Sequence, residues 1–161
     1  MAFPPLIMVL AIVATFGNAM PYVIAAISVS IIPDSVRIIR ANALQVRQAP
    51  YVDSAIALGY SHTRIIFRHM LPNVMAPYLI IFTAAVGGAI LAEAALSFLG
   101  LGVNEPTPAW GLMLPGGTEE SITGVYWTAV FPGVAITLAV FGFFVLGDAL
   151  RDVLDPKLRR G

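Results

Sequence analysis

The sequence predicts an all-α membrane protein, a polytopic helical bundle with about four transmembrane helices. Apolar residues make up 58% of the 161 residues, charged residues make up only 11%, and the mean hydropathy is +0.86. A soluble domain carries about 25% charged residues, so this chain could not cover its surface in water. Charged residues are also absent from 1–33, 73–92 and 121–147. The bilayer is therefore the expected solvent for most of the chain.

Composition and motifs also exclude several classes of function. The formal net charge is zero and no concentrated basic face occurs, so no nucleic-acid partner is expected. The lack of cysteine excludes a disulfide framework and a cysteine nucleophile. The sequence has no GxSxG motif and no Ser–His–Asp set at a common depth, so no catalytic residue is predicted. His62 and His69 are seven residues apart without HExxH spacing, so no metal site is predicted.

Four hydrophobic segments are expected to span the membrane. The first charge-free run is too long for one crossing, and Gly17-Asn18 followed by Pro21 is typical of a turn within it. The first segment is short against the roughly 20 apolar residues of a crossing helix. Because it begins at Met1 with no polar or basic flank, we expect missing upstream sequence rather than a signal peptide. The expected spans are about 3–16, 20–36, 75–99 and 126–146.

Basic residues indicate how the spans are oriented. Five of the nine Lys and Arg residues fall between spans two and three, and the other four follow span four. The segment 100–125 has three glutamates and no basic residue. The positive-inside rule therefore predicts a cytoplasmic loop at about 41–73, a cytoplasmic C-terminus and a periplasmic loop at about 100–125. The glycines and prolines of the periplasmic loop predict an ordered loop that is neither strand nor helix.

The cytoplasmic segment is predicted to form two short helices. Pro50 suits a first helical turn, and apolar residues follow at helical spacing until Gly59, which provides a C-terminal stop. Ser61 is an acceptable N-cap for a second helix, in which Arg64 and Arg68 lie four apart on one face. Such a pair suits docking into a groove of another protein, or lying on anionic lipid headgroups. The pattern alone leaves both interpretations open.

A specific resemblance begins in this segment. The family pattern is Glu-Ala-Ala, three residues, Gly, nine residues, Ile, one residue and Leu-Pro. It is matched in spacing by Asp53-Ser54-Ala55, Gly59 and Leu71-Pro72, with His69 at the Ile position. This resembles the EAA loop of the membrane subunits of binding-protein-dependent ABC importers. Other stretches resemble the dipeptide/oligopeptide/nickel branch of that family, namely 57–59, 65–73, 90–102 (ILAEAALSFLGLG), 106–111 (PTPAWG) and 147–158 (GDALRDVLDPKL).

The resemblance covers essentially the whole chain and implies a type I ABC-importer permease fold. It also implies an N-terminally truncated transmembrane domain, 1–161, that lacks the family's first two helices and their periplasmic connection. In that family the EAA loop forms coupling helices that sit in a cleft on the cytoplasmic ATPase subunit. The residues carried over to this role are Asp53, Ser54, Ala55, Gly59, Leu71 and Pro72.

The same resemblance implies several partners in a bacterial or archaeal plasma (inner) membrane. These are two cytoplasmic ATPase subunits, a second homologous permease subunit, an extracytoplasmic substrate-binding protein and membrane lipid. No GxxxxGK[ST] phosphate loop occurs in the sequence, so ATP and Mg are expected on the partner subunits. We therefore expect this chain to bind no cofactor and to have no enzyme activity of its own.

Two features of the third span are candidates for the translocation path or an interface. Glu93 is the one carboxylate well inside a predicted span, and an ionisable residue there is a functional hypothesis by default. The competing interpretation is a local hydrogen bond near the outer end of the span. Ala84, Gly88 and Ala92 place small residues on one face, which predicts close packing against the partner membrane subunit.

The predicted function is passage of di- to oligopeptides into the cytoplasm, with nickel chelates as a second cargo. In the family the outer side meets the substrate-binding protein, so Glu105 and Trp110 are candidate contacts, although interfacial anchoring explains Trp110 equally well. A chain of intramembrane ionisable residues would favour a secondary transporter, but the spans offer only Glu93. An inert truncated permease fragment is the remaining alternative, and we expect 1–161 not to fold stably alone.

Overall fold

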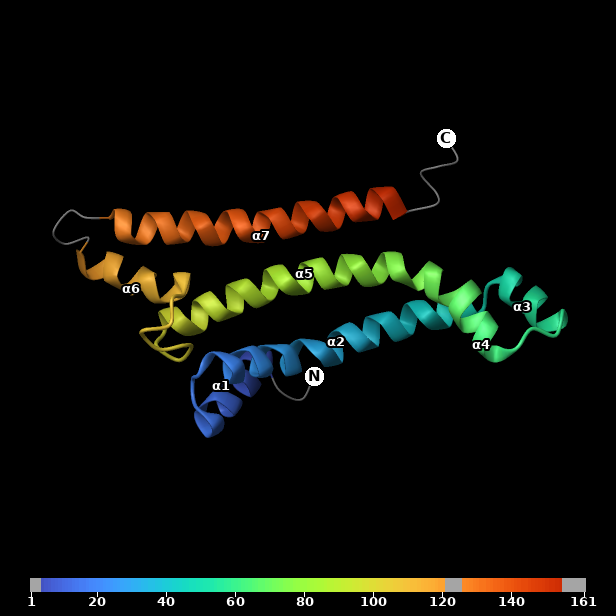
Figure 1. Ribbon diagram of the computed structural model, residues 1–161, viewed down its shortest axis with the longest axis horizontal. Coiled ribbons are helices and arrows are strands. Elements are labelled where there is room, and N and C mark those ends of the chain that lie inside the picture. The colour runs from blue at the N-terminus through green and yellow to red at the C-terminus, as the bar shows by residue number, and fades with distance from the viewer. Residues whose placement is uncertain (1–3, 121–125, 155–161) are drawn as a thin grey trace. The chain divides into compact units, whose positions relative to one another are not determined.

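The computed structural model describes residues 4–120 and 126–154, and within these ranges every regular element is a helix (Figure 1). The all-α prediction is therefore confirmed. In chain order the elements are α1 (Pro5–Phe16), α2 (Met20–Arg47), α3 (Pro50–Ala57), α4 (His62–Ile65), the π-helical turn η1 (Ile66–Met70), α5 (Leu71–Phe98), α6 (Trp110–Glu120) and α7 (Trp127–Leu154).

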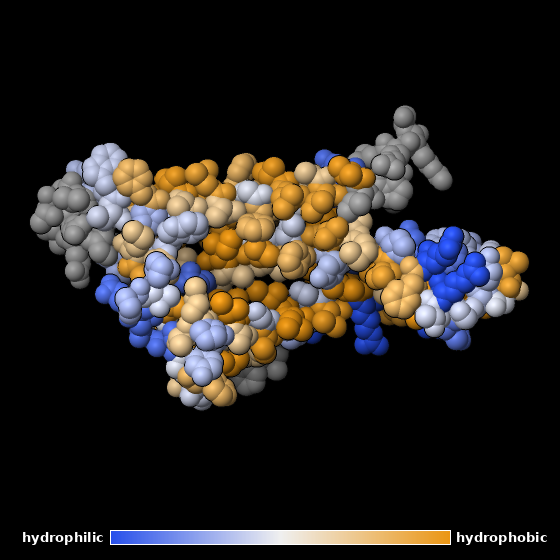
Figure 2. Space-filling model, viewed as in Figure 1, coloured by the Kyte–Doolittle hydropathy of each residue, from blue (hydrophilic) through white to orange (hydrophobic). Residues whose placement is uncertain are grey.

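Among residues 4–120 and 126–154, three helical stretches are long and apolar enough to cross a membrane. They are Met20–Arg47, His62–Phe98 and Trp127–Val153, with lengths of 28, 37 and 27 residues. α1 forms at the place expected for the first span, but its 12 residues fall short of the roughly 20 that a crossing needs. Large apolar side chains such as Leu138 and Phe141 of α7 are more than 60% exposed. Orange predominates along α5 and α7 in Figure 2, a surface suited to lipid rather than water.

The turn expected between the first two spans is present. Gly17 ends α1 with φ +91°, a left-handed conformation that favours glycine, and α2 begins at Met20. α2 continues through Pro33 and past the expected boundary at 36, and it ends at Arg47. Residues 38–47 are rich in Ala, Leu, Arg and Gln, which are good helix formers, so the start of the expected cytoplasmic loop is helical.

The second short helix of that loop differs from the expectation. α4 begins at His62 as expected, but it runs through η1 into α5 without a break. Leu71 N donates to Ile66 O, five residues back, which is the π-helical pattern. This wide turn comes immediately before Pro72, which has no N–H and would crowd a regular helix. The helix therefore accommodates proline at a π-helical turn instead of ending there.

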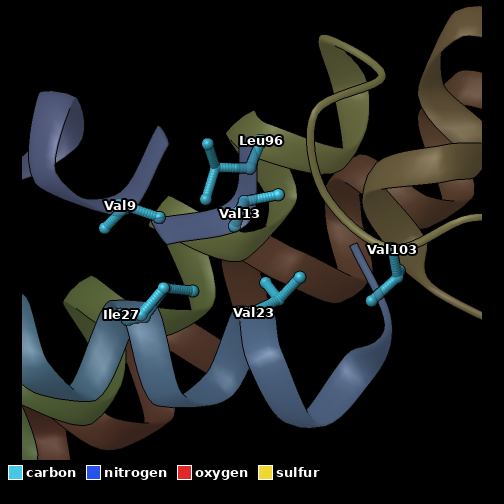
Figure 3. Close-up of a cluster of buried hydrophobic side chains, with 7 residues drawn as sticks. Val9, Val13, Val23, Ile27, Leu96 and Val103 are labelled. Atoms are coloured by element: carbon cyan, nitrogen blue, oxygen red, sulfur yellow. The ribbon is translucent and has the colours of Figure 1, made fainter. Parts of the chain in front are cut away.

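The described residues divide into two compact units. Unit 1 contains 4–32, 85–120 and 126–144, and unit 2 contains 33–84 and 145–154. The core of unit 1 brings α1, the first part of α2 and the end of α5 together (Figure 3). Its buried residues are Val9, Val13, Val23, Ala26, Ile27, Leu96 and Val103. A second cluster in this unit joins Ala94 of α5 to Ile136 and Val140 of α7.

The expectation that 100–125 contains no helix was wrong, because α6 occupies Trp110–Glu120. Residues 121–125 lie outside the described part of the chain. Gly111 packs so closely on α5 that an added Cβ would lie 2.8 Å from Ala94 Cα and from Ser97 Cβ. Packing against α5 thus outweighs the low helix propensity of glycine and of Pro115.

Candidate functional site

A helical hairpin formed by α3 and α4 contains most of the residues expected to couple to an ATPase. α3 begins with Pro50 in its first turn, as predicted. It ends in a Schellman motif, in which Gly59 N donates to Ile56 O at 2.9 Å and Tyr60 N donates to Ala55 O at 3.2 Å. Gly59 has φ +74°. The predicted stop at this glycine is confirmed, and it reverses the chain between the two helices.

The second arm of the hairpin is held by its cap and by ring contacts. Ser61 Oγ accepts a hydrogen bond from Arg64 N at 3.4 Å, which confirms the predicted N-cap. The Arg64 guanidinium lies over the Tyr60 ring, 4.2 Å from its centroid, in a cation–π contact. His69 of η1 also stacks on Tyr60, with ring centroids 5.8 Å apart. Val52, Ala55 and Ile65 form the small buried core between the arms.

The structure divides the residues of the EAA pattern between inner and outer positions. Ala55 is buried in the hairpin core, whereas Asp53 and Ser54 are exposed. Ser54 Oγ donates to Pro50 O at 2.9 Å. Leu71 and Pro72 are exposed at the start of α5, after η1, and so lie on another element than the Gly59 turn. Asp53, Ser54 and Gly59 are brought together on one hairpin.

Two apolar side chains just before the Gly59 turn are exposed. Ile56 is 53% exposed, although the apolar spacing groups it with Val52 and Ala55, and Leu58, which the sequence reasoning missed, is 72% exposed. Their exposure follows from helical spacing, because Val52 and Ala55 occupy the buried face of α3. That spacing was the available signal. The hairpin therefore presents an apolar tip that its own core does not cover.

Glu93 lies in a different site, a groove of about 540 Å³ in unit 1. Side chains of α2, α5 and the α5–α6 connection line this groove, and so do Trp110 and Met113 of α6. Ser97 Oγ donates to Glu93 Oε1 at 2.6 Å, so the local hydrogen bond considered for Glu93 is present. The same residue also lines the groove. Trp110, expected to meet a binding protein, is 46% exposed and lines the same groove, whereas Glu105 is exposed outside the groove.

The small residues of α5 face a second hollow of unit 1. Gly88 and Ala92 line this hollow of about 250 Å³ together with side chains of α1 and α2. A Cβ added to Gly88 would meet nothing within 4 Å. The open space at Gly88 is compatible with close approach of another helix, and packing against a partner subunit stays a prediction.

Comparison with known families decides which class of membrane protein this is. The family described as the binding-protein-dependent transport system inner membrane component matches residues 1–160. The chain belongs to this family. The resemblance predicted from the EAA loop is thereby confirmed, and with three helices of crossing length the chain is a multi-pass membrane protein.

Individual relatives are longer than the region that this chain matches. It is 45% identical over 159 residues to a putative peptide transport system permease protein of Brucella suis, covering 99% of this chain and 53% of the relative. It is 41% identical over 158 residues to the glutathione transport system permease protein GsiD of Salmonella typhimurium, covering 98% of this chain and 52% of the relative. The chain spans about half the length of the curated relatives it matches.

Proposed function

We propose that the chain forms part of the translocation path in the membrane subunit of an ATP-driven peptide importer. In this proposal the α3–α4 hairpin docks into a cleft on a cytoplasmic ATPase subunit. The observation that carries it is the apolar tip, with Ile56 and Leu58 exposed beside the exposed Asp53 and the Gly59 turn. An apolar projection with a polar flank suits a groove on another protein better than solvent.

The hairpin is also connected to a membrane helix in a way that supports coupling. α4 continues through η1 into α5, so a displacement of the hairpin is passed directly to residues of α5. Nucleotide-driven closure of two ATPase subunits would then bias the membrane helices between inward-open and outward-open arrangements. ATP and Mg²⁺ belong to those subunits in this proposal, and this chain contributes the continuous α4–η1–α5 helix that transmits the movement.

The family and the charge pattern support the remaining partners and the orientation in this proposal. We place the hairpin and the C-terminus in the cytoplasm, because five of the nine basic residues fall between the second and third expected spans and the other four follow the fourth. A second homologous permease subunit completes the path, and an extracytoplasmic binding protein delivers the cargo at the side of Glu105 and Trp110. Relatives named for peptide and glutathione transport favour a short peptide over a nickel chelate as cargo.

Co-purification from membranes tests the docking proposal. The wild-type chain, tagged at its C-terminus, is expected to bring down ATPase subunits, and Leu58→Asp is expected to reduce their recovery at least about tenfold. A tenfold loss corresponds to about 1.4 kcal/mol, which is ordinary for an apolar side chain central to an interface. Gly59→Asp, which changes the turn itself, should have the same effect.

Leu101→Asp is the matched control, because Leu101 is an exposed leucine in the α5–α6 connection, in the other unit. It should leave ATPase recovery unchanged at equal membrane insertion. The proposal is overturned if the inserted wild-type chain recovers no ATPase subunit. It is also overturned if both hairpin variants recover as much ATPase as the wild type.

A further inference from the structure

The Glu93 groove places one carboxyl group among apolar walls. Its walls come from Met20 and Ile24 of α2, Ile90 of α5, and Trp110 and Met113 of α6, all in unit 1. Its volume of about 540 Å³ lies within the roughly 300–1,000 Å³ range of small-molecule sites. Such a groove can bury hydrocarbon along most of its length, while the Glu93 carboxyl group offers one point of polar recognition.

The surrounding packing holds that carboxyl group in place. Glu93 Oε1 accepts the 2.6 Å hydrogen bond from Ser97 Oγ, and Ser97 is only 1% exposed. Gly102 approaches Ser97 so closely that an added Cβ would lie 2.6 Å from Ser97 N. The second carboxyl oxygen, Oε2, has no hydrogen-bond partner within the described ranges 4–120 and 126–154. One oxygen is thus used to orient the group, and the other is left for a ligand.

Unit 1 supplies no basic residue to pair with this carboxyl group. The sequence contains no Lys or Arg before Arg37 and none between Arg68 and Arg151. A carboxylate in apolar surroundings is costly unless a cation or several hydrogen bonds compensate it. Trp110 lines the same groove, and a tryptophan ring can also attract a cation through its π face. The groove therefore has the chemistry of an ammonium site whose cation must come from another molecule.

We propose that this groove binds the α-ammonium end of a short peptide. Glu93 receives the ammonium group, Trp110 lies beside it, and the apolar walls contact the first side chains of the peptide. The inference rests on the proposed function, since it takes the cargo to be a peptide with a free amino end. It goes beyond that function by naming the group that is recognised and the residue that recognises it.

Tryptophan fluorescence can test this on the full chain in dodecyl maltoside micelles, in preparations whose circular dichroism shows a helical chain that unfolds cooperatively. The chain has two tryptophans, so Trp127→Phe leaves Trp110 as the single reporter in the groove. The probes are alanyl-leucine, which has a free α-ammonium, and N-acetyl-alanyl-leucine, which does not. Alanyl-leucine is expected to change Trp110 emission saturably, and the acetylated peptide should need at least about a tenfold higher concentration. This comparison uses one protein, so it does not depend on how a groove variant folds.

Two carboxyl-to-amide variants test whether binding of alanyl-leucine depends on the Glu93 carboxyl group. Glu93→Gln should raise the half-saturating concentration of alanyl-leucine at least about tenfold. Asp148→Asn, at an exposed carboxyl group of α7 outside the groove, should leave it unchanged. Equal binding of the two peptides overturns the inference, and so does an unchanged Glu93→Gln variant. It is likewise overturned if phosphatidylethanolamine, another primary ammonium, changes the emission while alanyl-leucine does not.

The two proposals fail separately. If ATPase subunits co-purify through the hairpin but the groove does not distinguish the peptides, docking stands and the ammonium site is wrong. If the groove selects the free amine but no ATPase subunit is recovered, the site stands and the importer proposal is wrong.

Discussion

Gly59 determines the hairpin turn through its backbone rather than through contacts. Its φ of +74° is costly for residues with a Cβ, and an added Cβ would meet nothing within 4 Å. Gly59→Ala should therefore lower the free energy of unfolding of the hairpin by about 1–2 kcal/mol through the backbone alone. Gly59→Asn should lower it less, because asparagine tolerates the left-handed conformation better.

Hydrogen–deuterium exchange of the α3 and α4 amides would measure this, since faster exchange reports a lower opening free energy. The order of protection should be wild type, then Asn, then Ala. Equal protection in the Ala and Asn variants would show that the left-handed conformation does not determine hairpin stability. Sequence alone was sufficient to find this turn, because glycine's preference and the neighbouring Ser61 cap are local properties.

At the scale of helices, the sequence predicted starts and caps better than lengths. Pro50, Gly59 and Ser61 were identified correctly, because each acts within one turn of the chain. The continuation of α4 through η1 into α5 was not predicted, because a wide turn in front of Pro72 depends on the whole surrounding helix. α6 was missed for a related reason: its glycines and prolines predict a loop, and only packing against α5 makes it helical.

The packing of α6 can be tested with two glycine-to-alanine variants. Gly111→Ala should lower the free energy of unfolding by about 1–3 kcal/mol, because its Cβ would lie 2.8 Å from Ala94 Cα and Ser97 Cβ. Gly88→Ala should be neutral or stabilising by up to about 1 kcal/mol, because its Cβ meets nothing within 4 Å in a helix. Unfolding midpoints in detergent, followed by circular dichroism, would compare them. A Gly111→Ala chain as stable as wild type would mean that α6 does not depend on this close contact.

At the scale of the whole molecule, the sequence was enough to predict the bilayer environment and the family. The structure was needed to show which site residues lie together. Composition and charge-free runs sufficed for a multi-pass helical protein, and EAA spacing sufficed for the family. Neither could show that Trp110 lines one groove with Glu93, because this grouping depends on how α6 packs. Helical spacing placed Ala55 on the apolar face of α3, but it placed Ile56 on the same face, and only the hairpin core shows that Ile56 is exposed.

The orientation of the whole chain gives the final prediction. The chain has no cysteine, so a single introduced cysteine can be labelled without a background from the chain itself. Ala57→Cys in the hairpin and Asn104→Cys in the α5–α6 connection both place the thiol at an exposed position. The positive-inside rule predicts that a membrane-impermeant maleimide labels position 57 only in inside-out vesicles and position 104 only in right-side-out vesicles. Labelling of both from the same side would contradict the crossing by α5, and a reversed pattern would place the hairpin out of reach of any cytoplasmic ATPase.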